Sequence, residues 1–390
     1  MSEAVVVAAC RTAVGTAFKG TLVRTGPQEL AEAVVAEAVR RSGLPAEAFD
    51  DLLLGESRYG GGDIARHVAV TTGLTSVPGA AVNRHCASGL TTVAMAAAGI
   101  RAGMEDAVIA GGTQSSSTAP VLRLRDPQTG KWQDPWNSPA HPSTPTTPND
   151  DMSVAVGWNA ARLTGLTREE MDAGALRSHQ RAVAAIDEGL FREEIVPVKA
   201  LLADGSYAVF DIDEHPRRDT SMEKLAKLRP LHPEIEGFSI TAGNSSGIND
   251  AAAALALTSD ALAASNGLSP LAVVRGWASI GVDPEFTGLA PADAVRKALR
   301  RSGVALDAVN LFEINEAFAS VAVAATRALD IDPGIVNIHG SGCSIGHPIA
   351  ASGARMLTTL VHDLRRRGGG IGVAAMCAAG GQATAVVVEA

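Results

Sequence analysis

The sequence predicts an α/β fold, and three observations lead to it. Strand-like runs and helix-like patterns alternate through the first 112 residues. The alternation stops at a proline-rich segment, 126–152, and returns after residue 251. The last strand–helix–strand unit repeats the pattern of an earlier one. Such alternation is typical of sheets whose strands are joined by helical crossovers.

In the first stretch, apolar runs of strand length alternate with patterns of helical period. We expect strands at 4–9, 52–54, 80–83 and 107–110, and helices at 27–42, from residue 63, and at 86–102. Prolines from Pro127 to Pro148 forbid regular structure in 126–152, and a long irregular segment inside a compact protein is usually functional or disordered. Helix patterns resume at 152–164 and 167–188.

The second stretch ends in a unit that resembles residues 81–112. In both units a Val-Asn strand end leads into a helix of small residues, and the next strand ends in a glycine pair, Gly111-Gly112 or Gly380-Gly381. In order, we expect helix 251–265, strand 271–275, helix 291–302, strand 310–314, helix 316–328, strand 335–339, helix 347–366 and strand 371–377. We therefore predict an internal duplication, with an N-terminal half at 1–120 on which 251–270 packs, an inserted loop domain at 121–250, and a C-terminal half at 271–390.

Composition limits the classes of function. The chain has 390 residues and a formal net charge of -9, so it lacks the general basic surface that nucleic-acid binding needs. Its cysteines are scattered and form no CxxC pair, which argues against a zinc site or a disulfide framework and favours a cytoplasmic setting. The N-terminal run lacks the basic region of a signal peptide, and we expect no membrane span.

Cys86 follows the predicted strand at 80–83 and opens the next predicted helix. Free backbone N–H groups and the positive end of the helix dipole both favour a thiolate there. The neighbours in Cys86-Ala87-Ser88-Gly89 are small, so an acyl group can reach the sulfur. The alternative is a buried structural cysteine, since this residue type is often buried.

His347 stands in Gly346-His347-Pro348, before a predicted helix whose first turn Pro348 suits. A histidine at a helix start is disfavoured as a cation, and a neutral imidazole can act as a base toward a thiol. A structural histidine at a helix start is the alternative.

Two further residues stand at strand ends. Cys377 precedes Ala378-Ala379-Gly380-Gly381, where backbone N–H groups can point into a cavity, or else it is a buried strand cysteine. Asn315 follows the strand at 310–314. It either caps the next helix or holds a water or an oxyanion at a site.

Taken together, these motifs resemble the thiolase family, and they cover nearly the whole chain in family order. The matching segments are Ala9–Thr12, Asn83–Gly89, Arg177–Gln180, Thr241–Asp250, Asn315–Ala319, Gly346–Pro348 and Cys377–Gly381. The resemblance implies a five-layered αβαβα fold with two similar halves, a loop domain that covers CoA, and a homodimer or a dimer of dimers. It also implies an acetyl-CoA C-acyltransferase of fatty acid metabolism, which condenses or cleaves 3-ketoacyl-CoA through an acyl-cysteine.

By that resemblance, Cys86 is the nucleophile that accepts the acyl group, and His347 helps to deprotonate it. Cys377 would move the proton at the α-carbon, while Asn315, through a water, would join His347 in binding the thioester oxygen. Backbone N–H groups of Cys86 and Ala379 would form a second oxyanion hole; such donors contribute roughly 3–4 kcal/mol each. The set needs no metal or redox cofactor, because coenzyme A and acyl-CoA are substrates.

The resemblance also implies CoA contacts. Arg217 matches a family position near the nucleotide, and Ser246 matches one near the pantetheine arm. A basic run could bind phosphates or could form a solvated helix face; it comprises Arg218, Lys224, Lys227 and Arg229.

Three segments depart from the family pattern and bear on acyl-chain specificity. Residues 152–157 read Met-Ser-Val-Ala-Val-Gly where Met-Gly-x-Thr-Ala-Glu is frequent. Residues 377–380 read Cys-Ala-Ala-Gly instead of Cys-x-Gly-Gly, and 340–344 read Gly-Ser-Gly-Cys-Ser instead of Gly-Gly-Ala-Ile-Ala. Two other functions stay open. One is a decarboxylating condensing enzyme of the ketoacyl synthase type, and the other is a hydrolase or a catalytically silent CoA-binding protein.

Overall fold

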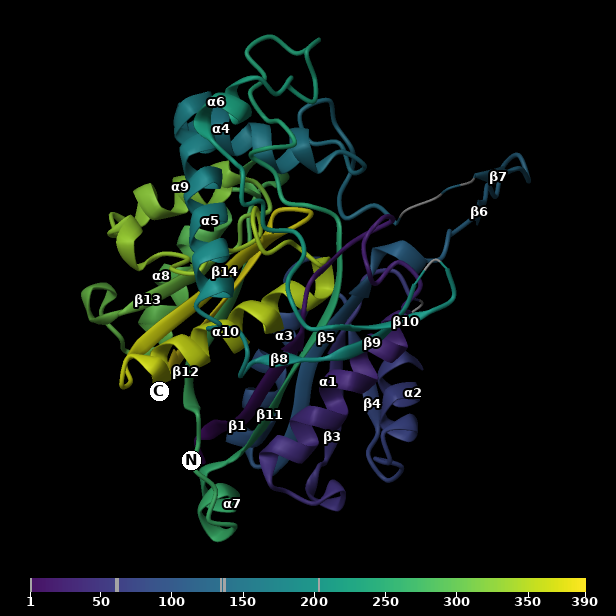
Figure 1. Cartoon of the computed structure of the whole chain (residues 1–390), viewed down its shortest axis with the longest axis vertical. Helices are drawn as coiled ribbons and strands as arrows, with labels where there is room; N and C mark the ends of the chain where they lie inside the picture. Colours follow the sequence, from purple (N-terminus) through teal and green to yellow (C-terminus); the bar gives the residue numbers. More distant parts are fainter. Residues whose placement is uncertain (1, 60–62, 134, 136–137, 203) are drawn as a thin grey trace.

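The computed structural model describes residues 2–59, 63–133, 135, 138–202 and 204–390. In this part of the chain the largest sheet runs in the order β13-β14-β15-β12-β1-β11-β5-β3-β4 (Figure 1). The fold is therefore the mixed α/β arrangement that the alternation predicted.

The N-terminal part of the sheet has a mixed strand order. β3 lies parallel to β4 and β5, β5 is antiparallel to β11, and β11 is antiparallel to β1. These strands are β1 (Ala4–Thr12), β3 (Asp51–Gly55), β4 (Gly79–Val82), β5 (Ala107–Ser115) and β11 (Asn249–Ser259). Their helices are α1 (Pro27–Ser42), α2 (Asp63–Thr71) and α3 (Ser88–Ala102).

The C-terminal part repeats this order. β13 is parallel to β14, β14 is antiparallel to β15, and β15 is antiparallel to β12. These strands are β12 (Ala272–Gly281), β13 (Leu311–Ile314), β14 (Ile371–Ala378) and β15 (Gln382–Glu389), with helices α8 (Ala290–Ser302), α9 (Ala319–Leu329) and α10 (Ser352–Arg366). A parallel bridge between Phe312 and Val336 stands where β3 pairs with β4 in the first half. The predicted duplication is confirmed.

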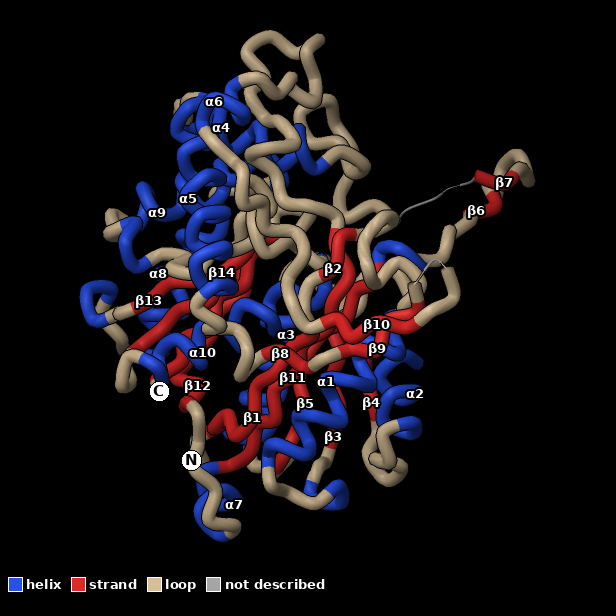
Figure 2. Tube along the Cα trace, viewed as in Figure 1, coloured by secondary structure: helices blue, strands red, loops and turns tan. Residues whose placement is uncertain are grey.

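Three apolar cores separate the layers. The first joins α1 and α2 to one face of the N-terminal strands, and the third joins α8 and α9 to the C-terminal strands. The core between them contains α3 and α10 together with strands of both halves. The two halves meet where β1 pairs with β12, at Val5–Val273 and Val6–Ala272. This gives the predicted order of five layers, helix–sheet–helix–sheet–helix (Figure 2).

The helices of the middle layer touch through small residues. A side chain at Gly89 of α3 would place its Cβ 2.7 Å from the backbone N of Ala354 in α10. A side chain at Gly353 would meet the backbone N of Leu90. Only glycine allows this approach, because a Cβ needs more room than these contacts leave.

Several predicted elements were wrong. Residues 251–259 form strand β11, and only 260–265 form a helix, α7 (Asp260–Ser265). Every residue of β11 is buried, so its Ala-rich sequence shows no alternation and resembles a helix. Strand β15 was missed. The strand expected at 335–339 is reduced to the bridge at Val336, and α10 begins at Ser352 after a short 3-10 turn, Ile349–Ala351.

Residues between β5 and β11 form a region of loops, short elements and one long helix, α5. Figure 1 shows α4, α5 and α6 together at one end of the molecule and a hairpin of β6 and β7 projecting from its side. The elements are β6 (Leu124–Arg125), β7 (Trp132–Gln133), a π-helix (Ser153–Trp158), α4 (Asn159–Thr164), α5 (Arg168–Asp187), β8 (Ile195–Val196), β9 (Val198–Leu201), β10 (Tyr207–Phe210) and α6 (Met222–Ala226). The predicted irregularity of 126–152 agrees with this, although residues 134, 136 and 137 lie outside the described part. The domain boundaries after residues 120, 250 and 270 stay predictions.

A buried ion cluster ties this region to the first strand. Arg11 of β1 is fully buried, and its guanidinium lies 2.6 Å from Glu194 and 2.7 Å from Asp213. In addition, β8 pairs with β1 in parallel. Among the described helices, none is long and apolar enough to cross a membrane.

Candidate active site

Cys86 lies in a tight turn between β4 and α3, two residues before the helix begins. The preceding residue, His85, has a left-handed backbone with φ 46°, which is costly for a residue other than glycine. Two side chains hold this turn. The Asn83 Oδ1 accepts the His85 N–H at 2.9 Å, and the Ser88 hydroxyl accepts the Arg84 N–H at 2.9 Å. The nucleophile candidate is thus fixed by the strained turn that precedes it.

Burial raises the pKa of the Cys86 thiol to about 11, even though the N–H groups of Cys86 and Ala379 hydrogen-bond to the sulfur and lower it. The backbone donors favour the thiolate as expected, but desolvation outweighs them, so the net effect is a raised pKa. A neutral thiol needs a base before it can attack. The same two N–H groups are those expected to form an oxyanion hole.

Cys377 and Asn315 meet at the same edge of the sheet. β13 and β14 are parallel, with Ile314 opposite Ala375, and the Asn315 N–H donates to the Ala375 carbonyl at 3.0 Å. Cys377 is buried, and burial together with the neighbouring Cys86 raises its pKa. The two sulfurs therefore interact, although they come from opposite ends of the chain.

His347 is buried beside Asn315. Its backbone N–H donates to the Asn249 Oδ1 at 2.9 Å, and its Nδ1 lies 2.6 Å from the Ser352 hydroxyl and 3.4 Å from the Asn315 Nδ2. The Nε2 atom is buried without a hydrogen-bond partner in the described structure. Burial, followed by the charge of Arg355, lowers the His347 pKa to about 4, so the ring is neutral near pH 7.

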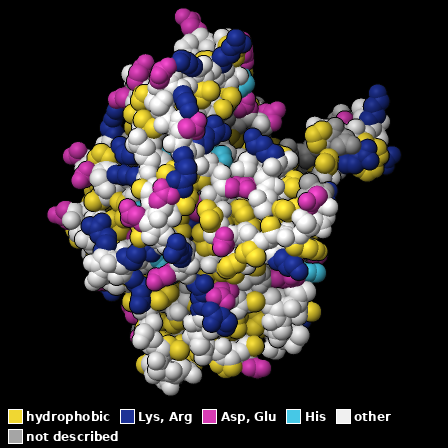
Figure 3. Space-filling view, viewed as in Figure 1, with side chains coloured by type: hydrophobic (Ala, Val, Ile, Leu, Met, Phe, Trp, Pro, Cys, Tyr) yellow, Lys and Arg dark blue, Asp and Glu magenta, His cyan; other side chains and the backbone are white. Residues whose placement is uncertain are grey.

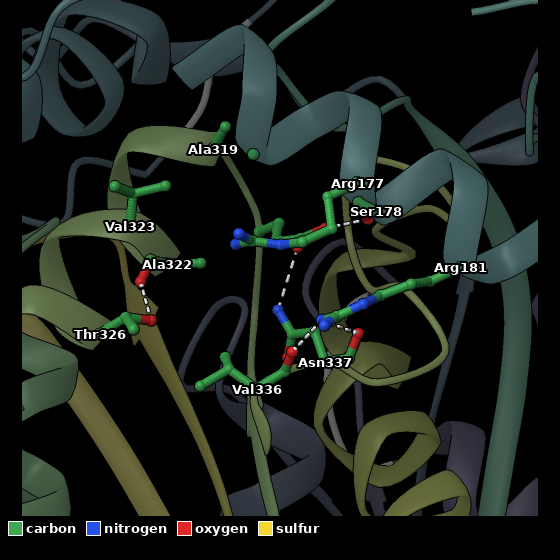
Figure 4. Close-up of a pocket in the computed structure, with 11 residues that line it drawn as sticks. Arg177, Ser178, Arg181, Ala319, Ala322, Val323, Thr326, Val336 and Asn337 are labelled. Atoms are coloured by element: carbon green, nitrogen blue, oxygen red, sulfur yellow. Dashed lines mark hydrogen bonds between the residues drawn. The ribbon is translucent and has the colours of Figure 1, made fainter. Parts of the chain in front are cut away.

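Glu316 connects the loops around these residues. Its carboxylate accepts from the Ser178 hydroxyl at 2.5 Å, the Asn337 amide at 3.0 Å and the Cys343 N–H at 3.2 Å. Figure 4 shows Ser178 of α5, Asn337 and Ala319 of α9 around a small cavity. Glu316 therefore joins α5, the end of β13 and the loop that precedes His347.

A groove of about 660 Å³ borders this site. Both predicted CoA contacts, Arg217 and Ser246, line it, as does Cys343. Among the described residues, the basic side chains on its lining are Lys19 and Arg217, with His179 and His215 beside them. The His179 Nδ1 accepts the Arg217 N–H at 3.1 Å, which fixes the backbone of the Arg217 loop.

The basic run after Arg217 is occupied by ion pairs. Arg218 lies 2.6 Å from Asp187, and the two lysines of the run, Lys224 and Lys227, each lie 2.5 Å from an acidic side chain. All three side chains are more than half exposed, so this run resembles a solvated helix face more than a phosphate site. Within the described chain, no three His, Cys, Asp or Glu side chains are placed to hold a metal ion.

Some residues of the site carried no signal in the sequence. Asn249 was quoted only as part of a motif, and Ser352 was not singled out. Ser352 contacts His347 because the chain folds back at the turn 349–351, and Asn249 contacts it because the start of β11 lies beside it, where Ile248 bridges to His347. Lys19 and His215 reach the groove from loops that no periodic pattern marks.

Comparison with known proteins agrees with this geometry. Residues 4–261 match the model of the thiolase N-terminal domain, and residues 268–390 match that of the thiolase C-terminal domain. This chain belongs to the thiolase family. The acetyl-CoA acetyltransferase of Syntrophomonas wolfei is 40% identical over 100% of this chain and 99% of its own length. The 3-ketoacyl-CoA thiolase of Bacillus subtilis is 38% identical over the full length of both chains.

A solved thiolase-family structure has the same architecture. The crystal structure of the Bacillus anthracis acetyl-CoA acetyltransferase superposes with a TM-score of 0.89, at 37% identity, over 100% of this chain and 99% of that one. The expected thiolase fold is thereby confirmed.

The glycine at position 157, a departure from the thiolase pattern, allows Phe318 to pack closely against the backbone. Gly157 stands where thiolases often carry glutamate, and a Cβ at this position would lie 2.7 Å from Cγ of Phe318. The Phe318 ring therefore lies directly on the π-helix. Val154 and Val156 of that helix pack in the same core as Phe318, Cys343 and Cys377. The altered segment 152–157 thus forms part of the wall around the second cysteine.

Proposed function

We propose that this chain is an acetyl-CoA C-acyltransferase that condenses two acyl-CoA thioesters, or cleaves 3-ketoacyl-CoA, through an acyl group on Cys86. The observation that carries the proposal is that the Ala379 N–H, two residues after Cys377, hydrogen-bonds to the Cys86 sulfur, so that both thiols belong to one site. Two thiols suit a reaction that needs a nucleophile and a separate acid–base group. The names of the Syntrophomonas and Bacillus relatives support the same reaction class.

In the first half-reaction, His347 Nε2 takes the thiol proton of Cys86, and the thiolate attacks the thioester carbonyl carbon. The backbone N–H groups of Cys86 and Ala379, which contact the sulfur, support an oxyanion role. The carbon–sulfur bond to CoA then breaks, and the departing CoA sulfur takes the proton of Cys377. The acyl group remains on Cys86.

In the second half-reaction, the Cys377 thiolate takes a proton from the α-carbon of an incoming acetyl-CoA. The enolate oxygen is held by His347 and, through a water, by Asn315. The enolate carbon attacks the acyl carbon, and Cys86 leaves and recovers its proton from His347. The raised pKa of Cys377 suits this step, because a thiolate that is hard to form is a strong base.

The test is thiolysis and condensation by Cys86→Ala and Cys377→Ala variants. We expect Cys86→Ala to lose activity and to take up no acetyl group from acetyl-CoA, as measured by mass spectrometry. Cys377→Ala should still be acetylated but should lose condensation. Cys10→Ala, a buried thiol bonded to the Val34 carbonyl, is the matched control and should keep activity.

The outcomes separate the rival functions. Full condensation activity in Cys377→Ala, with a preference for malonyl thioesters, would favour the decarboxylating type. Steady release of free acid would favour a hydrolase. Absence of labelling in the wild-type protein would favour a silent CoA-binding protein.

The remaining features of the proposal concern substrates and assembly. Coenzyme A and acyl-CoA are the substrates, with Arg217 and Ser246 as contacts in the groove, and no metal or redox cofactor takes part. The protein acts in the cytoplasm, in fatty acid metabolism. Activity that survives exhaustive chelation and dialysis would agree with the cofactor expectation; activity restored only by a metal would contradict it.

We also propose a homodimer or a dimer of dimers. Strand β4 supports this, because it ends the strand order of the described sheet and its residues are half-buried. The hairpin seen projecting in Figure 3 adds exposed apolar surface, with Trp132 60% and Leu124 39% exposed. Analytical ultracentrifugation that finds a monomer at micromolar concentration would refute the proposal.

A further inference from the structure

The imidazole of His347 is held at one nitrogen and free at the other. Nδ1 lies 2.6 Å from the Ser352 hydroxyl, whereas the buried Nε2 has no hydrogen-bond partner in the described structure. Ser352 itself is fully buried. The contact to the Asn315 amide at 3.4 Å is long and weak by comparison. The Ser352 hydroxyl is therefore the main support of the ring.

The backbone around this pair is also fixed. The Asn249 side chain accepts the His347 N–H at 2.9 Å and donates to the Gly15 carbonyl at 3.0 Å. Gly346 has φ 115°, and a Cβ there would lie 2.6 Å from the Asn249 side chain. Asn249 thus sets the position of the His347 backbone, which leaves the rotation of the ring to Ser352.

We propose that Ser352 is the positioning residue of His347, and that its neutral hydroxyl keeps Nε2 directed at the reacting sulfur through each protonation state of the ring. This inference rests on the proposed function, because it explains how one imidazole serves as a base and as an oxyanion donor. A neutral ring that is to take the Cys86 proton carries its hydrogen on Nδ1, and the hydroxyl oxygen accepts it. The hydroxyl accepts that hydrogen again when the ring is an imidazolium. If the hydrogen lies on Nε2 instead, the hydroxyl can donate to Nδ1.

A carboxylate could not replace the hydroxyl in this role. It only accepts hydrogen bonds, and its charge would stabilise the imidazolium. The charged group that acts on His347 in the structure is Arg355 of α10, and its positive charge disfavours the imidazolium and lowers the His347 pKa. Arg355 itself lies 3.7 Å from Glu313 of β13. From the other elements, Asn249 and Asn315 are neutral, and the titratable groups around the ring are the Cys86 and Cys377 thiols, with Glu316 and Cys343 in the loops behind it.

The first experiment compares Ser352→Ala with the wild type in the thiolysis assay. We expect kcat to fall about tenfold or more with little change in KM, because the ring loses its orientation while the groove is untouched. The control is Thr358→Val, which removes another fully buried hydroxyl from α10, one without a hydrogen-bond partner in the described structure. It should keep wild-type kcat.

The second experiment measures the rate of Cys86 alkylation by iodoacetamide against pH in the wild type and in Ser352→Asp. A carboxylate at Nδ1 should shift the alkylation profile to lower pH by about one unit or more, because an imidazolium beside Cys86 favours the thiolate. An unchanged profile in Ser352→Asp, or a wild-type kcat in Ser352→Ala, would overturn the proposal.

The proposed function can fail independently. If His347→Asn keeps full thiolysis activity, the assignment of the base is wrong and Ser352 has nothing to position. If His347→Asn is inactive and Ser352→Ala is not impaired, only the inference about Ser352 fails. If Ser352→Asp does not fold, the kcat of Ser352→Ala decides the matter.

Discussion

Replacement of Arg11 by methionine tests how the inserted region is held on the first strand. The Arg11 guanidinium donates to Glu194 at 2.6 Å and to both oxygens of Asp213 at 2.7 and 2.9 Å, and all three side chains are fully shielded from solvent. These partners lie 183 and 202 residues away in sequence. Methionine keeps the length of the side chain and removes the charge.

The contacts that Glu194 and Asp213 keep in Arg11→Met determine the expected loss of stability. In Arg11→Met, Glu194 keeps the Thr359 hydroxyl at 2.9 Å, and Asp213 keeps the Val14 N–H at 2.7 Å. The two buried carboxylates then lose the cation that hydrogen-bonds to both, and the buried Arg355, whose charge also acts on Glu313, offsets theirs from a greater distance. Removing one partner of a buried pair costs about 3–5 kcal/mol, and we expect the free energy of unfolding to fall by an amount in the upper part of that range.

The assay is equilibrium unfolding in urea near pH 7, followed by circular dichroism and tryptophan fluorescence. Arg218→Met is the matched control, because the Arg218–Asp187 pair is 60% and 54% exposed and should contribute less than about 1 kcal/mol. Adding Glu194→Gln and Asp213→Asn to Arg11→Met should recover part of the loss, since amides are cheaper to bury than unpaired carboxylates. If Arg11→Met is no less stable than Arg218→Met, the reasoning about the buried cluster is wrong.

Three further predictions concern the site. Gly157→Ala should lower the free energy of unfolding in urea by about 1–3 kcal/mol and reduce thiolysis, because the new Cβ would lie 2.7 Å from Phe318. Gly281→Ala is the control and should leave both unchanged, because the atom nearest to its Cβ is 4.0 Å away. The pKa values of His347 and His179 are lowered to about 4, so the unfolded state binds more protons than the folded state between pH 6.5 and 4. The free energy of unfolding should therefore decrease as the pH is lowered through that window, by up to about 1.4 kcal/mol per pH unit for each ring. His179→Gln should reduce this slope, and an unchanged slope would count against it. Alkylation of Cys86 in the unliganded protein should keep rising to about pH 11, and a plateau by pH 8 would contradict the burial argument.

The sequence predicted well those features that depend on local pattern. Cys86 and Asn315 each follow a strand and Cys377 lies at the end of one, and the ends of β4, β13 and β14 place them at one site. The helices α1 and α8 matched their periodic patterns closely, because each buries one face.

The features that were missed depend on tertiary structure. β11 is buried along its whole length, so its sequence carries no period-two signal, and its alanines favoured a helix. The turn at 349–351 that brings Ser352 to His347 has no marker beyond Pro348. The raised pKa of Cys86 arises because the whole fold buries the thiol, and the position of a residue at a helix start does not reveal how deeply it is buried.

The glycine contacts between α3 and α10 have a consequence for how this scaffold can diversify. Because Gly89 and Gly353 leave no space for even a methyl group, natural variation at the base of the nucleophile is confined to mutations that leave the backbone where it is. The π-helix wall beside Cys377 is restricted in the same way, because Gly157 leaves no room for a Cβ against the Phe318 ring. The packing therefore fixes the backbone beside both cysteines, at α3 next to Cys86 and at the π-helix next to Cys377.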